Sequence, residues 1–126
     1  MNDVRRELGQ WGERIAEAYL LQKGLRIEER NYRTARGEID LVAWEGDVLV
    51  FVEVRTRTSM KYGSALESIT RQKKKKLREM ALAYLQAKTK PSRPFRFDVV
   101  GIQYQDRGGE AHTGQTPVIT HIEHAF

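Results

Sequence analysis

Residues 37–57 read GEIDLVAWEGDVLVFVEVRTR, and this stretch decides the fold. Two apolar runs flank a central Gly-Asp pair, which is typical of a β-hairpin closed by a two-residue turn. With that turn, Asp40 lies opposite Glu53, and Glu38 lies opposite Arg55. A turn shifted by one residue would pair Glu38 with Glu53 instead. In both registers the hairpin places two carboxylates across from each other.

Alternation of side chains along the two strands predicts one wholly apolar face, made of Ile39, Leu41, Ala43, Val50, Val52 and Val54. The opposite face is apolar near the turn and carries the charged side chains farther along. Opposed Cβ atoms lie ~5 Å apart, where like charges are destabilising, so the two carboxylates need a proton, a cation or a metal. Two interpretations stay open. The charges form a structural cluster, or Asp40 and Glu53 together hold a hard divalent cation such as Mg²⁺ or Mn²⁺.

The rest of the chain predicts a mixed sheet covered by helices. Apolar residues recur at helical spacing over 3–23, and Gly24 follows as a left-handed cap. A second helix begins after Thr70, with Ser64 and Glu67 in a capping-box pattern before it. Its buried stripe is Leu77, Met80, Ala81, Tyr84 and Leu85. Strands are predicted over 25–33, 38–57 as a hairpin, 95–104 and 118–126, with a polar loop over 105–117. This order lacks βαβ alternation, which excludes a Rossmann fold.

Composition narrows the class of protein. A chain of 126 residues is typical of one domain, so we expect one α/β domain over residues 1–126. The absence of cysteine excludes disulfides, thiolate metal sites and a cysteine nucleophile. A formal charge of +5 favours an anionic partner such as nucleic acid. We find no signal-peptide pattern and no apolar run of the ~20 residues that a membrane span needs. We therefore expect a soluble, cytoplasmic protein with no membrane partner.

The hairpin resembles the Asp…Glu-x-Lys signature of the restriction-endonuclease-like (PD-(D/E)XK) superfamily. The chain is most similar to the bacterial YraN-type proteins, relatives of archaeal Holliday-junction resolvases. The similarity extends through GERIAEAYL, NYR, GSALESIT, RFDVV and HIEHAF. It implies an αβββαβ core in which Asp40 and Glu53 bind magnesium and Glu13 of the first helix completes the acidic site. Ile39 stands where the superfamily name has proline, and Arg55 stands at the catalytic lysine position.

Glu13 can also be weighed from its position alone. It lies at the margin of the buried stripe of the first helix, so its carboxylate could reach the sheet or face water. Asp98 alternates with apolar residues and is predicted to be a salt-bridge partner. The three histidines have no spacing typical of a metal site.

A basic rim is predicted beside the acidic end of the hairpin. The run RQKKKK at residues 71–76 loads the start of a helix with cations, where free backbone N–H groups also favour phosphate. Lys73 lies four residues before Leu77 and is expected to lean toward the acidic cluster, whereas Lys74 and Lys75 fit a solvated run equally well. The candidate phosphate-binding residues are Arg33, Arg36, Arg57, Lys61, Lys73 and Lys76.

These features predict a Mg²⁺-dependent endonuclease that acts on structured or branched DNA, with Asp40, Glu53, Glu13 and Arg55 at its site. The relation to junction resolvases makes a homodimer attractive, since two nicks need two sites. Two alternatives remain. One is a nucleic-acid-binding module with the same fold and little or no cleavage, and the other is a domain that binds an acidic protein through its basic surface.

Overall fold

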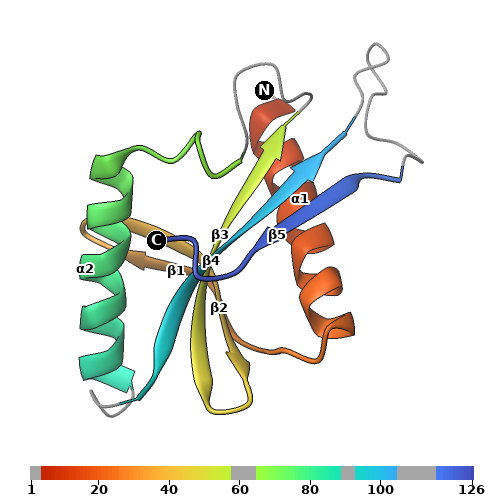
Figure 1. The fold of residues 1–126 in the computed structure, drawn as a ribbon. Helices are drawn as coiled ribbons and strands as arrows, with labels where there is room; N and C mark the ends of the chain where they lie inside the picture. The colour runs from red at the N-terminus through yellow and green to blue at the C-terminus, as the bar shows by residue number, and fades with distance from the viewer. Residues whose placement is uncertain (1–3, 58–64, 89–92, 105–115) are drawn as a thin grey trace.

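The computed structural model describes residues 4–57, 65–88, 93–104 and 116–126. The elements follow in the order α1 (Val4–Gln22), β1 (Arg26–Thr34), β2 (Gly37–Glu45), β3 (Val48–Arg57), α2 (Arg71–Lys88), β4 (Phe95–Gln103) and β5 (Val118–Ile122). The five strands form one sheet, with α1 against one face and α2 against the other (Figure 1). This arrangement confirms the predicted α/β fold class and is compatible with a restriction-endonuclease-like core.

The sheet has the strand order β1-β2-β3-β4-β5 and is mixed, because β3 and β4 pair in parallel while the other neighbours are antiparallel. The β2–β3 turn consists of Gly46 and Asp47, and Gly46 has a φ of 58°, which suits a tight hairpin turn. The pairs run from Glu45–Val48 to Leu41–Val52. The predicted register is therefore correct over this segment, and the alternative that is shifted by one residue is wrong there.

The caps and the buried helical stripe predicted from the sequence are confirmed. Gly24 ends α1 with a φ of 95°, and the amide of Leu25 donates to the Leu20 carbonyl at 3.0 Å. Thr70 caps α2, since its hydroxyl accepts the amide of Lys73 at 3.0 Å. All five predicted stripe residues of α2 are buried. Ser64 lies outside the described residues, as does most of the predicted 105–117 loop, and β5 ends at Ile122 rather than at residue 126.

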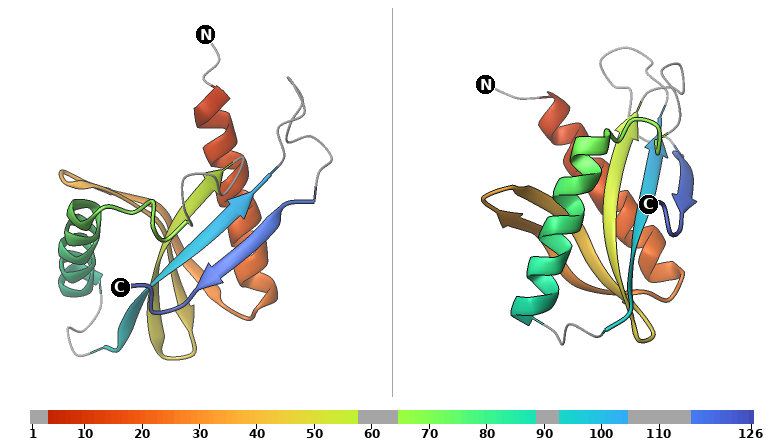
Figure 2. Two further views of the ribbon diagram at one scale, coloured as in Figure 1. Left: turned by 45° about the horizontal axis from the view of Figure 1, so that its top comes forward. Right: turned by 60° about the vertical axis from the view of Figure 1, so that its left-hand side comes forward.

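The predicted apolar face of the hairpin is wrong at one position. Leu41 packs with the α1-side cluster, but Ile39 packs with the α2-side cluster, so the alternation slips by one residue at Asp40. The β2–β3 ladder also ends at Leu41–Val52, before the Asp40–Glu53 position. Beyond it, the Asp40 carboxylate accepts the Val54 amide at 2.8 Å in place of a backbone partner. Figure 2 shows β1 and β2 leaning away from β3 and β4 at this end.

Helix α1 crosses β3 closely at one residue. A Cβ atom on Gly12 would lie 1.8 Å from Thr56 Oγ1 and 3.0 Å from Thr56 Cβ, so only glycine allows this approach without a shift. Glu13 is the next residue on the helix, and the contact therefore brings its carboxylate to the sheet. In the part of the chain that the structure describes, neither helix is long and apolar enough to cross a membrane.

Candidate metal centre

A pocket of about 380 Å³ opens where β2 parts from β3. It is lined by Leu8, Gly9, Glu13, Asp40, Glu53, Val54, Arg55 and Thr56. The four residues that the sequence assigns to the active site thus line one pocket, although they come from α1, β2 and β3. The opening between the two strands is what allows side chains from different faces of the sheet to meet.

Three carboxylates form a group beside this pocket, and two of them, Glu13 and Asp40, line it. Glu13, Glu38 and Asp40 each offer one oxygen, and these oxygens lie within 4.8 Å of one another. Hard cations such as Mg²⁺ prefer carboxylate oxygens, so the set is chemically suited to a divalent ion. Glu38 belongs to this group, whereas the predicted ligand Glu53 does not, and Glu38 also accepts a hydrogen bond from Arg33 at 3.0 Å. The hairpin pattern indicated Glu38 only as an alternative partner of Glu53.

Glu53 forms the floor of the pocket and is only 5 % exposed. Its Oε1 atom has no hydrogen-bond partner among the described residues. A buried carboxylate oxygen without a partner is costly unless a proton or a cation satisfies it. This orphaned oxygen is a second, independent indication that the pocket suits a cation.

Electrostatics in the pocket favour uptake of positive charge. Burial, followed by the charge of Glu53, raises the pKa of Asp40 to about 8. Burial also raises the pKa of Glu53, although the nearby cations Lys73 and Arg55 oppose the rise. These carboxyl groups therefore hold a proton more tightly than free carboxyl groups do, and an arriving divalent cation would displace it.

Two cations approach Glu53. Arg55 Nη2 lies 3.3 Å from Glu53 Oε2, and its buried Nε atom has no partner among the described residues. Lys73, in the first turn of α2, also lowers the pKa of Glu53 through its charge. Lys73 therefore lies near the acidic cluster, as its helical position predicts. Two elements, β3 and α2, thus each bring a cation to Glu53.

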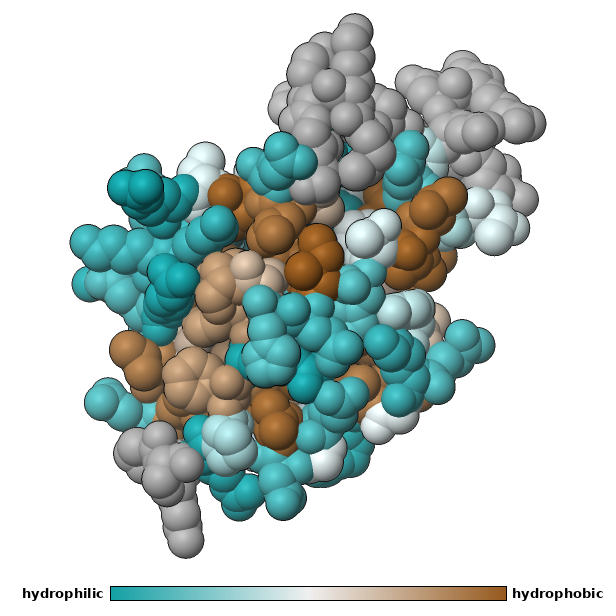
Figure 3. Space-filling view, in the orientation of Figure 1, coloured by the Kyte–Doolittle hydropathy of each residue, from teal (hydrophilic) through white to brown (hydrophobic). Residues whose placement is uncertain are grey.

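The remaining predicted phosphate-binding residues are spread around the site. Arg33 is 81 % exposed at its side chain, and Arg36 is held by Glu79 of α2 at 2.8 Å. Lys76 is exposed on α2, and the upper left of Figure 3, where α2 begins, is mainly hydrophilic. Arg57 borders a separate small cavity between β3, β4 and β5. Lys61 lies outside the described residues.

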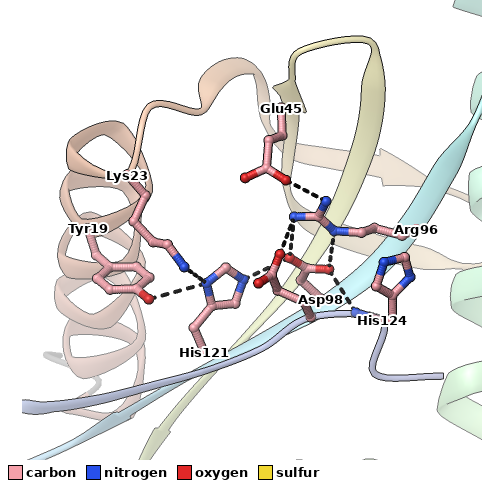
Figure 4. Close-up of polar contacts among 8 residues, drawn as sticks. Tyr19, Lys23, Glu45, Arg96, Asp98, His121 and His124 are labelled. Atoms are coloured by element: carbon pink, nitrogen blue, oxygen red, sulfur yellow. Dashed lines mark hydrogen bonds and ion pairs between the residues drawn. The ribbon is translucent and has the colours of Figure 1, made fainter.

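A buried polar network at β4 and β5 was only partly predicted. Asp98 is fully buried, and its carboxylate accepts hydrogen bonds from Arg96 at 2.9 Å and from His121 at 2.7 Å (Figure 4). Burial alone would raise the pKa of Asp98, but these hydrogen bonds outweigh it and lower that pKa below its ordinary value. The salt-bridge prediction for Asp98 is confirmed. His121 could not be assigned as its partner from the sequence, because the contact depends on the pairing of β4 with β5.

One further residue at the site was not predicted. Asn31 of β1 donates from Nδ2 to Glu13 Oε1 at 3.0 Å. The motif NYR contains it, but a strand pattern alone assigns such a residue to the solvent.

Comparisons with known proteins agree with one another. The family model described as "Uncharacterised protein family UPF0102" matches residues 12–102, which include Glu13, Asp40, Glu53 and Arg55. A UPF0102 protein of Pelotomaculum thermopropionicum is 48 % identical over 126 residues and covers 100 % of both chains. The UPF0102 protein of Syntrophomonas wolfei is 42 % identical, over 98 % of this chain and 100 % of its own. That of Moorella thermoacetica is 47 % identical, over 81 % of this chain and 85 % of its own. The chain therefore belongs to the UPF0102 family, the YraN-type proteins that its motifs resemble.

Proposed function

We propose that this protein is a divalent-metal-dependent endonuclease of the restriction-endonuclease-like superfamily, acting on structured or branched DNA. The observation that carries the proposal is the pocket of carboxylates: three oxygens within 4.8 Å of one another, beside a buried Glu53 oxygen without a partner among the described residues. Lys73, part of the basic run at 71–76, lies close enough to act on the charge of Glu53, and DNA phosphates are anions that such a run can bind.

The donor set fits Mg²⁺ or Mn²⁺. Asp40, Glu53 and Glu13 would hold the ion, and Glu38 lies close enough to Glu13 and Asp40 to join or replace one of them. A bound divalent cation supplies an activated water and offsets negative charge on the scissile phosphate. The pocket opens to solvent between β2 and β3, so a phosphodiester can reach it from outside the sheet.

Arg55 would act on the phosphate rather than on the water. Its guanidinium is permanently charged, so it can stabilise negative charge in the transition state but cannot serve as a base. The Arg55 side chain is 31 % exposed and lines the pocket, so its guanidinium can donate to the oxygens of a phosphate that enters.

A second function is favoured by one observation. Arg55 pairs with Glu53 at 3.3 Å, so a counter-charge is already present in the pocket without a metal. A protein that keeps the fold and this ion pair could bind DNA through its basic surface and leave the phosphodiester intact. This is the nucleic-acid-binding module.

A cleavage assay separates the two functions. Purified protein is incubated with junction, flap, duplex and single-stranded DNA in Mg²⁺, in Mn²⁺ and in EDTA, and the products are resolved on denaturing gels. The endonuclease proposal expects metal-dependent nicking that is lost in Asp40→Asn and in Glu53→Gln. Salt-sensitive binding with no nicking under any of these conditions supports the binding module. Absence of both binding and nicking refutes both functions and leaves the protein-interaction domain.

A further inference from the structure

Asn31 adopts a backbone conformation that asparagine tolerates better than most residues. Its φ is 50°, in the left-handed region, and it lies inside β1 rather than in a turn. A non-glycine residue there is unfavourable by a modest amount, although the short polar side chain of asparagine reduces that cost. A strained residue within a strand persists only when its surroundings hold it in place.

The left-handed conformation of Asn31 changes the face of the sheet on which the following side chains of β1 lie. Arg30 contacts Glu17 of α1, whereas Tyr32 packs edge-on against Tyr84 of α2 with ring centroids 4.9 Å apart. Between them, Asn31 also points to α1, where it donates to Glu13 at 3.0 Å. The alternation of β1 therefore slips by one residue, and two successive side chains face the same helix.

The same slip occurs in the neighbouring strand at the matching position. The β1–β2 ladder pairs Arg30 with Leu41 and Tyr32 with Ile39, which places Asn31 across from Asp40. Leu41 packs on the α1 side and Ile39 on the α2 side, so β2 also shifts its facing at Asp40. The two irregular positions lie side by side, and both side chains are directed to Glu13.

We infer that Asn31 is a positioning residue of the metal centre. Its left-handed backbone, beside the irregular position of Asp40, directs the Asn31 side chain to α1. Its side-chain amide holds the Glu13 carboxylate in place for the group formed by Glu13, Glu38 and Asp40. The inference rests on the proposed function, because it concerns ligands of the proposed ion. Partners that orient a ligating carboxylate typically contribute ten- to a hundredfold in metal affinity.

Two substitutions separate the backbone role from the amide role. Asn31→Gly keeps access to the left-handed conformation and removes the amide, whereas Asn31→Ala removes both. Mn²⁺ binding is measured by calorimetry, and urea unfolding is measured in EDTA. We expect Asn31→Gly to bind Mn²⁺ about tenfold more weakly or worse, with an unfolding midpoint close to that of the parent. Asn31→Ala should bind as weakly or more weakly and also unfold at a lower urea concentration.

A matched control has the same backbone geometry at a distant place. His124 has a φ of 51° and lies after β5, where its backbone N–H donates to the Asp98 carboxylate at 3.3 Å. His124→Gly should leave Mn²⁺ affinity unchanged. A change in that affinity as large as the one in Asn31→Gly would show that the loss comes from a general backbone effect, and would overturn the positioning role.

A double-mutant cycle tests whether Asn31 acts through Glu13. In a Glu13→Ala background, which has no acceptor for the Asn31 amide, Asn31→Gly should cause no further loss of Mn²⁺ affinity. If Glu13→Ala binds too weakly for calorimetry, the side-chain amide resonances of Asn31 serve instead, and Glu13→Ala should shift them in the metal-free protein. Parent-like affinity in Asn31→Gly, an undiminished loss in the double mutant, or unshifted resonances would overturn the inference while the metal centre stands. A parent protein that binds no Mn²⁺ would refute the metal centre itself, and the positioning role with it.

Discussion

Replacement of Asp40 by asparagine should change how the stability of the protein depends on pH. Burial and the charge of Glu53 raise the pKa of Asp40 to about 8 in the folded chain, against 3.8 as its ordinary value. Between these two values the folded chain holds a proton that the unfolded chain has released. The free energy of unfolding of the metal-free parent should therefore fall as pH rises from about 4 to about 8. Below pH 4 the contribution of Asp40 to this free energy should stay nearly constant.

The size of the effect follows from the same shift. Each unit of difference between folded and unfolded pKa corresponds to about 1.4 kcal/mol, which sets an upper limit of about 6 kcal/mol for the whole window. The pocket opens to water and strand β2 can relax, so we expect on the order of 2–3 kcal/mol between pH 5 and pH 8. Asp40→Asn cannot release this proton. It should lose most of the pH dependence and be more stable than the parent at pH 8.

The assay is urea unfolding in EDTA at four pH values from 5 to 8, for the parent and for Asp40→Asn. Asp47→Asn, which alters an exposed aspartate of the β2–β3 turn, is the control and should follow the parent. A saturating divalent cation should stabilise the parent at pH 8 more than at pH 5, since the ion replaces the proton. A difference in free energy of unfolding between parent and Asp40→Asn that stays constant across the range would refute the reasoning.

Three further predictions concern α1, β3 and α2. Gly12→Ala should lower the free energy of unfolding by about 1–3 kcal/mol, because its new Cβ would overlap Thr56, and Thr56→Ala should restore part of the loss; thermal unfolding measures both. Gly9→Ala is the stability control, since nothing lies within 4 Å of a Cβ there, and an equal loss in that variant would argue against the overlap. Arg55→Lys should cleave DNA at least as fast as the parent. Arg55→Ala should fold and bind metal, but it should cleave on the order of a hundredfold more slowly. Equal cleavage rates in all three proteins would exclude a catalytic role for Arg55. Replacing Lys73–Lys76 together by glutamine should weaken binding to every DNA duplex alike. The slope of log affinity against log salt concentration should become shallower by about 0.9 for each phosphate that is no longer neutralised. An unchanged slope would show that these lysines face solvent and do not contact DNA.

The sequence predicted those parts of the fold that depend on local chemistry. The Gly-Asp turn implied the correct register over 41–45 and 48–52, and the Thr70 cap and the apolar stripe of α2 follow from helical spacing. Glycine, proline and the cap residues act over a few residues, so their effects can be predicted without knowledge of the tertiary structure.

The irregular part of the sheet could not be predicted in the same way. Strand patterns assume that side chains keep alternating, and that assumption misplaced Ile39 because the alternation slips at Asp40. Arg36 fits a basic rim in the sequence, but its ion pair with Glu79 depends on how α2 packs against the sheet. The group of Glu13, Glu38 and Asp40 likewise requires the close approach of α1 to β3.

The hydrogen bond from the Val54 amide to Asp40 bears on the choice of an inactive variant. This carboxylate is also part of the sheet, because it takes the place of a backbone acceptor where β2 has left β3. Alanine at position 40 would leave a part-buried N–H group without that acceptor, at a cost of about 1–3 kcal/mol, whereas asparagine keeps an oxygen in the same place. A loss of activity in Asp40→Ala would therefore combine a missing ligand with a damaged strand. Only the asparagine variant isolates the chemistry of the charge.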